Sequence, residues 1–167
     1  MDFQKEYSDS HEGSMKRIAS NYHTVTLRFF LAACLAFPLL FACSHQPVYP
    51  TAGRVGPNIV IDPASLTPEI PQFYTYHYQG KNISYFVLKV QDKVLSFFDA
   101  CASCYTHKRG YRYENGSVTC RNCNVKFSIF NLEKGLGSCY PLKIEGRMEN
   151  GKYLIPVAAL EYAADKF

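Results

Sequence analysis

A chain of 167 residues is long enough for one compact domain, and its ordinary composition argues against a disordered or fibrous protein. The formal net charge of +4 comes from dispersed Lys and Arg residues, without the long basic runs that mark many nucleic-acid binders. We therefore expect a globular protein that has no nucleic-acid partner.

Residues 1–42 have the pattern of an export signal. Basic Arg17 and Arg28 precede a nearly continuous apolar stretch over residues 29–42. This stretch is too short to cross a bilayer comfortably as a permanent helix, although an uncleaved N-terminal anchor is the alternative. Translation from Met15 would give a signal of ordinary length.

The sequence Leu-Phe-Ala-Cys at residues 40–43 resembles the lipobox of bacterial lipoproteins, in which the cysteine is acylated and becomes the new N-terminus. We therefore expect Cys43 to carry a lipid that anchors the protein to a membrane of the cell envelope. Ser44 after this cysteine resembles outer-membrane sorting in Gram-negative bacteria, so we expect the protein in the periplasm or at the outer membrane. Residues 43–71 contain six of the nine prolines, which predicts an extended linker because proline fixes φ and removes amide donors.

From residue 72 onward, short runs rich in Tyr, Phe, Val and Ile alternate with turn signals. This pattern predicts a mainly β domain over residues 72–167. Asn115-Gly116 and Asn150-Gly151 predict hairpins, since both central residues of a type I′ turn have positive φ. Pro156 begins a predicted short C-terminal helix. The expected strands cover residues 73–78, 83–90, 94–98, 111–114, 117–119, 125–129, 142–149 and 152–155.

Two C-x2-C pairs, Cys101 with Cys104 and Cys120 with Cys123, are separated by 15 residues. Each pair is suited to a tight knuckle that directs two sulfur atoms at one point, as in zinc ribbons. Four thiolates also suit iron or an iron-sulfur cluster, so the spacing predicts a metal without choosing it. Disulfides are the alternative in an oxidising compartment, although cross-pairing between the knuckles would leave Cys139 unpaired.

The cysteines lie within short segments that occur in a fixed order. These are Phe98-Asp99-Ala100-Cys101, Cys104 with Gly110-Tyr111, Cys120-Arg121-Asn122-Cys123 with Phe127, and Gly137-Ser138-Cys139-Tyr140-Pro141. Over about residues 72–160 they resemble the FtrD-like family of membrane-associated iron-sulfur proteins. The resemblance implies an iron-sulfur centre in a domain that commonly accompanies a multi-span membrane region near iron-uptake permeases. This chain has a lipobox-like motif in place of those spans, and its last segment departs from the Gly-Gly-Cys-Asn-Pro that the family often has.

The order of elements after Tyr85 also resembles, more distantly, a Rieske ferredoxin. This likeness implies a small β-barrel or sandwich in which the loop around Cys139 and Pro141 closes over the metal. Cys139 would then be an additional ligand or a close neighbour of the metal, and His107 beyond the first knuckle is a further candidate. Four cysteines in place of two Cys and two His predict a low reduction potential.

The segment between Cys101 and Cys139 carries six basic and two acidic side chains. This charge would attract an acidic redox partner, unless it is ordinary solvated loop charge. No motif for acid-base or nucleophilic catalysis stands out, so we expect an electron carrier and not an enzyme. Its partner would be a redox protein or an iron-transport component, in iron uptake or respiration. The alternatives are a structural zinc module for protein interaction and a thiol-disulfide redox protein.

Overall fold

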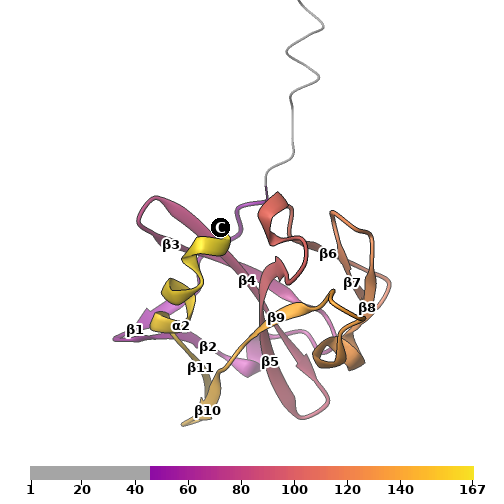
Figure 1. Cartoon of the computed structure of the whole chain (residues 1–167). Helices are drawn as coiled ribbons and strands as arrows, with labels where there is room; N and C mark the ends of the chain where they lie inside the picture. Colours follow the sequence, from indigo (N-terminus) through magenta and orange to yellow (C-terminus); the bar gives the residue numbers. More distant parts are fainter. Residues whose placement is uncertain (1–45) are drawn as a thin grey trace, which may run out of the picture. The chain divides into compact units, whose positions relative to one another are not determined.

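The computed structural model describes residues 46–167, which form three antiparallel sheets and several short helices (Figure 1). The predicted signal over residues 1–42 and the predicted lipidation site Cys43 lie outside the described residues, so both stay predictions. Within residues 46–167, no helix is long and apolar enough to cross a membrane.

The first sheet unites the beginning and the end of the described chain. Its order is β1-β2-β11-β10, because the predicted C-terminal hairpin pairs with a hairpin that the sequence did not reveal. The turn residues Asn150 and Gly151 have φ of 49° and 74°, which confirms the predicted hairpin. The strands are β1 (Gly53–Val55), β2 (Asn58–Ile61), β10 (Arg147–Glu149) and β11 (Lys152–Pro156).

The prediction of an extended linker is wrong for the part of residues 43–71 that forms β1, β2 and the 3-10 helix η2 (Pro63–Ser65). Alternate residues Ile59 and Ile61 are buried, and so is Leu66. Pro57 lies in the turn between β1 and β2, and Pro63 begins η2. Both prolines occupy positions where no ladder N–H is required, so they did not prevent folding.

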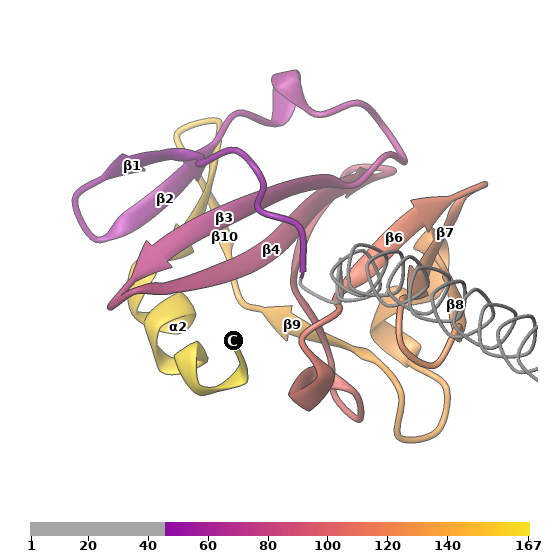
Figure 2. The ribbon, with the colours of Figure 1, turned by 90° about the horizontal axis from the view of Figure 1, so that it is seen from above.

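The second sheet has the order β3-β4-β5-β9, and its central strands are buried on both faces. Along β4, Ile83, Tyr85 and Val87 face a core shared with the first sheet and the C-terminal helix. Phe86 and Leu88 face a second core, shared with the third sheet. Figure 2 shows the second sheet between the first sheet on one side and the third sheet on the other. Alternating side chains thus divide the interior into two cores. The strands are β3 (Gln72–Tyr78), β4 (Lys81–Val90), β5 (Lys93–Cys101) and β9 (Pro141–Ile144).

The single strand predicted over residues 142–149 is two strands in different sheets. β9 pairs with β5, whereas β10 pairs with β11. Gly146 lies between them, and a Cβ at this position would overlap the ring of Tyr153. The chain therefore changes sheets at a position where a side chain would not fit.

The third sheet has the order β6-β7-β8 and carries the second cysteine pair. At its first turn, Asn115 and Gly116 have φ of 47° and 72°, as predicted. The mainly β fold and the short terminal helix are confirmed, but the strands are divided among three sheets and do not form one continuous barrel. The remaining elements are β6 (Tyr111–Glu114), β7 (Ser117–Cys120), β8 (Lys126–Ser128), η3 (Tyr105–His107), η4 (Ile129–Lys134), α2 (Val157–Tyr162) and η5 (Ala164–Lys166).

Candidate metal centre

Four cysteine sulfur atoms meet where the second sheet approaches the third. Cys101 ends β5 and Cys120 ends β7, while Cys104 and Cys123 lie in the loops that follow. The Sγ atoms of all four lie within 4.8 Å of one another. The fold therefore brings together the two pairs that are well separated along the chain.

Backbone hydrogen bonds hold both loops in tight turns. In the first, the N–H of Cys104 donates to the carbonyl of Cys101 over 3.0 Å. In the second, the N–H of Asn124 donates to the carbonyl of Cys120, also over 3.0 Å. Asn124 has a φ of 58°, a left-handed conformation that asparagine tolerates better than most residues. Each knuckle is thus shaped by its own backbone.

A buried aspartate joins the two knuckles. Asp99 lies two residues before Cys101, and its Oδ1 accepts a hydrogen bond from the N–H of Tyr111 at 2.5 Å. Tyr111 is in turn the cross-strand partner of Cys120. At the neighbouring Gly110, which has a φ of 65°, a Cβ would overlap the Asp99 carboxylate. Only glycine therefore fits both this conformation and this close approach.

The Asp99 carboxylate is almost completely buried, and burial raises its pKa to about 6. Hydrogen bonds from Gln46 and from the N–H of Tyr111, together with the charge of Arg121, oppose this rise. Gln46 donates to Oδ2 over 2.7 Å, so both carboxylate oxygens have partners. The carboxylate thus connects Gln46 and the start of β6 to the strand that ends at the first knuckle.

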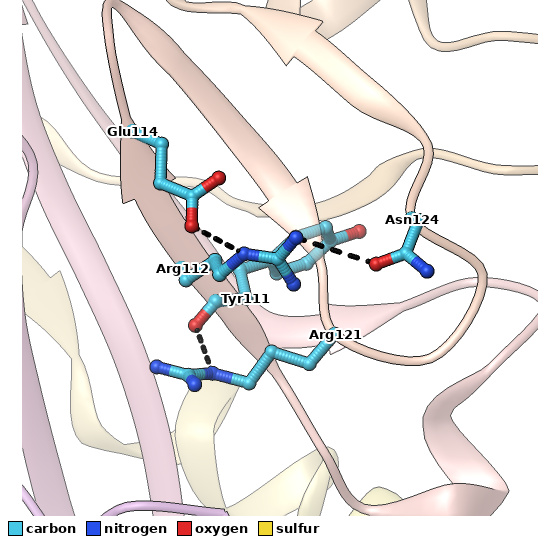
Figure 3. Close-up of polar contacts among 5 residues, drawn as sticks. All are labelled: Tyr111, Arg112, Glu114, Arg121 and Asn124. Atoms are coloured by element: carbon cyan, nitrogen blue, oxygen red, sulfur yellow. Dashed lines mark hydrogen bonds and ion pairs between the residues drawn. The ribbon is translucent and has the colours of Figure 1, made fainter.

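Two arginines brace the second knuckle (Figure 3). The Nε of Arg121 donates to the Tyr111 carbonyl over 2.8 Å. Arg112 forms an ion pair with Glu114 at 2.6 Å and reaches Oδ1 of Asn124 at 3.3 Å. The arginines thus attach the cysteine turn to the strand β6.

A third loop packs against the first knuckle and carries Cys139. The hydroxyl of Ser103 donates to the Ser138 carbonyl over 2.6 Å, and the N–H of Ala102 donates to the Tyr140 carbonyl over 3.0 Å. The half-buried Cys139 thiol interacts with the side chains of Ser103 and Cys123. Cys139 is therefore beside the site, although it is outside the group of four sulfurs.

His107 has no place in the sulfur group. It lies in η3 with its side chain exposed, and the cluster among the described residues consists of four cysteines alone. The structure gives no support to the prediction of His107 as an additional ligand.

Burial raises the pKa of three thiols at or beside the site, which disfavours their thiolate forms. It raises the pKa of Cys120 to about 12, and it also raises the pKa values of Cys104 and Cys139. Burial acts in the same direction on Cys123, but the N–H of Val125 and the neighbouring cysteines outweigh it and lower the pKa of this exposed thiol. A metal ion would supply the positive charge that holds all four as thiolates.

The size of the sulfur group suits a metal. A tetrahedral ion with metal–sulfur bonds of about 2.3 Å separates its ligands by about 3.8 Å, within the observed limit. A cluster of several irons needs a wider spacing between the four sulfurs. Cys123 is the exposed ligand, so its side chain is the one with most freedom to move outward and provide that spacing. The donor set itself suits zinc, iron and iron-sulfur centres.

Asp99, Tyr111 and Arg121 were not predicted to have a role at the site. The one available signal was an acidic residue next to two phenylalanines near the end of a predicted strand, a position where a carboxylate needs buried partners.

Comparison with known proteins gives one family match. Residues 66–167 match the family "Membrane iron-sulfur containing protein FtrD-like", and this range includes all three cysteine-bearing loops. No curated protein and no solved structure gives a significant match.

Proposed function

Because the chain belongs to the FtrD-like family of membrane iron-sulfur containing proteins, we propose that its four converging cysteines hold an iron-sulfur centre that carries electrons at a membrane. The approach of the four Sγ atoms to within 4.8 Å of one another is the observation that supports a shared metal centre most directly, and the family match is what favours an iron-sulfur centre. A thiolate-bound iron centre supplies one-electron redox chemistry when it is present. The chain itself holds the ligands, excludes water and presents the site to a partner.

The burial of the cysteines is graded in a way that suits electron transfer. Cys101 and Cys120 are part of the second core, which also contains Phe127 and Leu132. Cys123, in contrast, is exposed. Such an arrangement keeps most of the site dry while it leaves one ligand at the surface, where a redox partner can approach.

The surface around the site supports an acidic redox partner. Lys108 and Arg109 follow the first knuckle, Lys126 follows the second, and Lys134 precedes the third loop; all four are exposed and form no ion pair among the described residues. Leu136 and Tyr140 add exposed apolar area on the third loop. Basic charge around an apolar centre favours fast encounter with an acidic surface, on a redox protein or an iron-transport component.

A lipid anchor on Cys43 would hold this site close to the membrane. The described chain begins at Gln46, whose side chain bonds to Asp99 beside the first knuckle. Three residues of extended chain span at most about 11 Å. Because β1 and β2 belong to the folded domain, no long spacer follows the proposed anchor. The partner we favour is therefore at or in the membrane of the envelope.

Anaerobic purification of the full chain from membranes, followed by visible absorption and metal analysis, tests the proposal. Iron, acid-labile sulfide and absorption that a reductant bleaches reversibly would support it. Colourless protein with one zinc per chain would instead indicate a structural zinc module. Metal-free protein with titratable disulfides would indicate a thiol-disulfide protein.

A further inference from the structure

The hydroxyl of Tyr111 is a buried polar group that the fold leaves without a partner. The side chain is fully buried, and its oxygen forms no hydrogen bond among the described residues. Leaving such a group unsatisfied costs about 1–3 kcal/mol, so an unpartnered buried hydroxyl calls for an explanation.

Contacts on several sides hold the Tyr111 ring in place. Phe86 and Phe127 pack against it edge to face, with centroid distances of 6.1 and 6.2 Å. At its backbone, the N–H donates to Asp99 and the carbonyl accepts from Arg121. The hydroxyl is therefore held where it is and cannot easily turn toward solvent.

The sulfurs of Cys101 and Cys120 lie in the same core as the Tyr111 ring, and a metal-bound thiolate is a hydrogen-bond acceptor. Tyr111 is the cross-strand partner of Cys120, and both belong to the same core as Cys101. Burial and then the Cys101 side chain raise the pKa of Tyr111. The Asp99 carboxylate already accepts from Gln46 and from the N–H of Tyr111, and the Tyr111 hydroxyl forms no hydrogen bond to it.

We propose that the Tyr111 hydroxyl donates a hydrogen bond to the Cys101 sulfur when that sulfur is a metal-bound thiolate, and that this bond raises the reduction potential of the site. The inference rests on the metal centre proposed above. Reduction adds negative charge to the sulfurs, so a donor at this position stabilises the reduced form more than the oxidised form. Tyr111 is thus a positioning and tuning residue.

Tyr111→Phe in the full, iron-loaded chain removes the hydroxyl and keeps the ring. Tyr85→Phe is the matched control, because its hydroxyl is also buried and unpartnered but lies in the other core. We expect Tyr111→Phe to shift the reduced-to-oxidised ratio about tenfold toward the oxidised form, which is about 59 mV for a one-electron couple. Tyr85→Phe should leave the potential unchanged. Equal potentials for wild type and Tyr111→Phe, or equal shifts in both variants, would overturn the inference.

A second measurement separates this inference from the proposed electron-transfer function. Cobalt(II) bound to four thiolates gives sulfur-to-metal charge-transfer absorption whether the natural metal is iron or zinc. Loss of a donor to sulfur should move this band to longer wavelength in Tyr111→Phe and leave it in place in Tyr85→Phe. If the band does not move in Tyr111→Phe, the hydrogen bond is refuted, even if the iron-loaded protein carries electrons. If the band moves but the purified natural protein binds only zinc, the hydrogen bond is supported and the redox function is refuted.

Discussion

The N–H of Tyr111 lies 2.5 Å from Oδ1 of Asp99, and this hydrogen bond connects the two cysteine knuckles. Asp99 lies in the strand that ends at Cys101, and Tyr111 pairs with Cys120 in the third sheet. A buried carboxylate therefore helps to fix the position of one sulfur pair relative to the other, within the core that both pairs share.

The four clustered cysteines should be individually necessary for the metal. Replacing any of them with serine removes a ligand from a site whose metal is coupled to folding, so metal content should fall from one centre per chain to nearly none. Cys139→Ser should keep the metal, because Cys139 lies outside the group of four. Metal analysis of anaerobically purified variants measures this. Loss of metal from Cys139→Ser as complete as from the others would show that the site has five essential cysteines. The variants are Cys101→Ser, Cys104→Ser, Cys120→Ser and Cys123→Ser.

Gly110→Ala should disrupt the link between the knuckles. The added Cβ would overlap the Asp99 carboxylate, and its backbone has a φ of 65°. Gly116→Ala is the control, since Gly116 has a φ of 72° but open space around it, so it should cost only about 1 kcal/mol of backbone strain. Thermal unfolding and metal content of the two variants measure the difference. If both variants lose the same amount of thermal stability and metal, the close approach of Gly110 to Asp99 does not contribute to the stability of the site.

Ser103→Ala should loosen the third loop without removing a ligand. The variant loses the 2.6 Å hydrogen bond to the Ser138 carbonyl, worth about 1 kcal/mol. We expect metal content at purification to be unchanged, and metal transfer to an added chelator to be several-fold faster. Ser138→Ala is the control, because it keeps the carbonyl that accepts this bond. If both variants release metal at the wild-type rate, the loop does not protect the site.

Reversing surface charge near the cysteines should change the rate of electron exchange according to the charge of the reagent. Arg109→Glu with Lys134→Glu should slow oxidation of the reduced protein by anionic ferricyanide and speed its oxidation by a cationic cobalt complex. Lys93→Glu, at the opposite end of β5, should have little effect. Stopped-flow rates at low salt measure these changes, which should shrink as ionic strength rises. Identical changes with both reagents would argue against electrostatic steering.

Local chemistry accounts for what could be recognised in the sequence. The C-x2-C spacing predicted the knuckles, and both Asn-Gly pairs predicted hairpins, because each depends only on residues adjacent in the chain. Alternation of apolar residues likewise indicated most of the strands. The proline-rich segment was misread, since proline content reports on backbone freedom and not on the partner that β2 finds in β11.

The remaining features arise from contacts between residues far apart in the chain. Particular neighbours in space are required for the sulfur pairs to converge, for the chain to change sheets at Gly146 and for Asp99 to connect the two knuckles. No periodicity or spacing encodes those neighbours, because they are selected by how two cores pack against the opposite faces of β4. Cysteine spacing specified the ligands, whereas packing of the sheets placed them at one point.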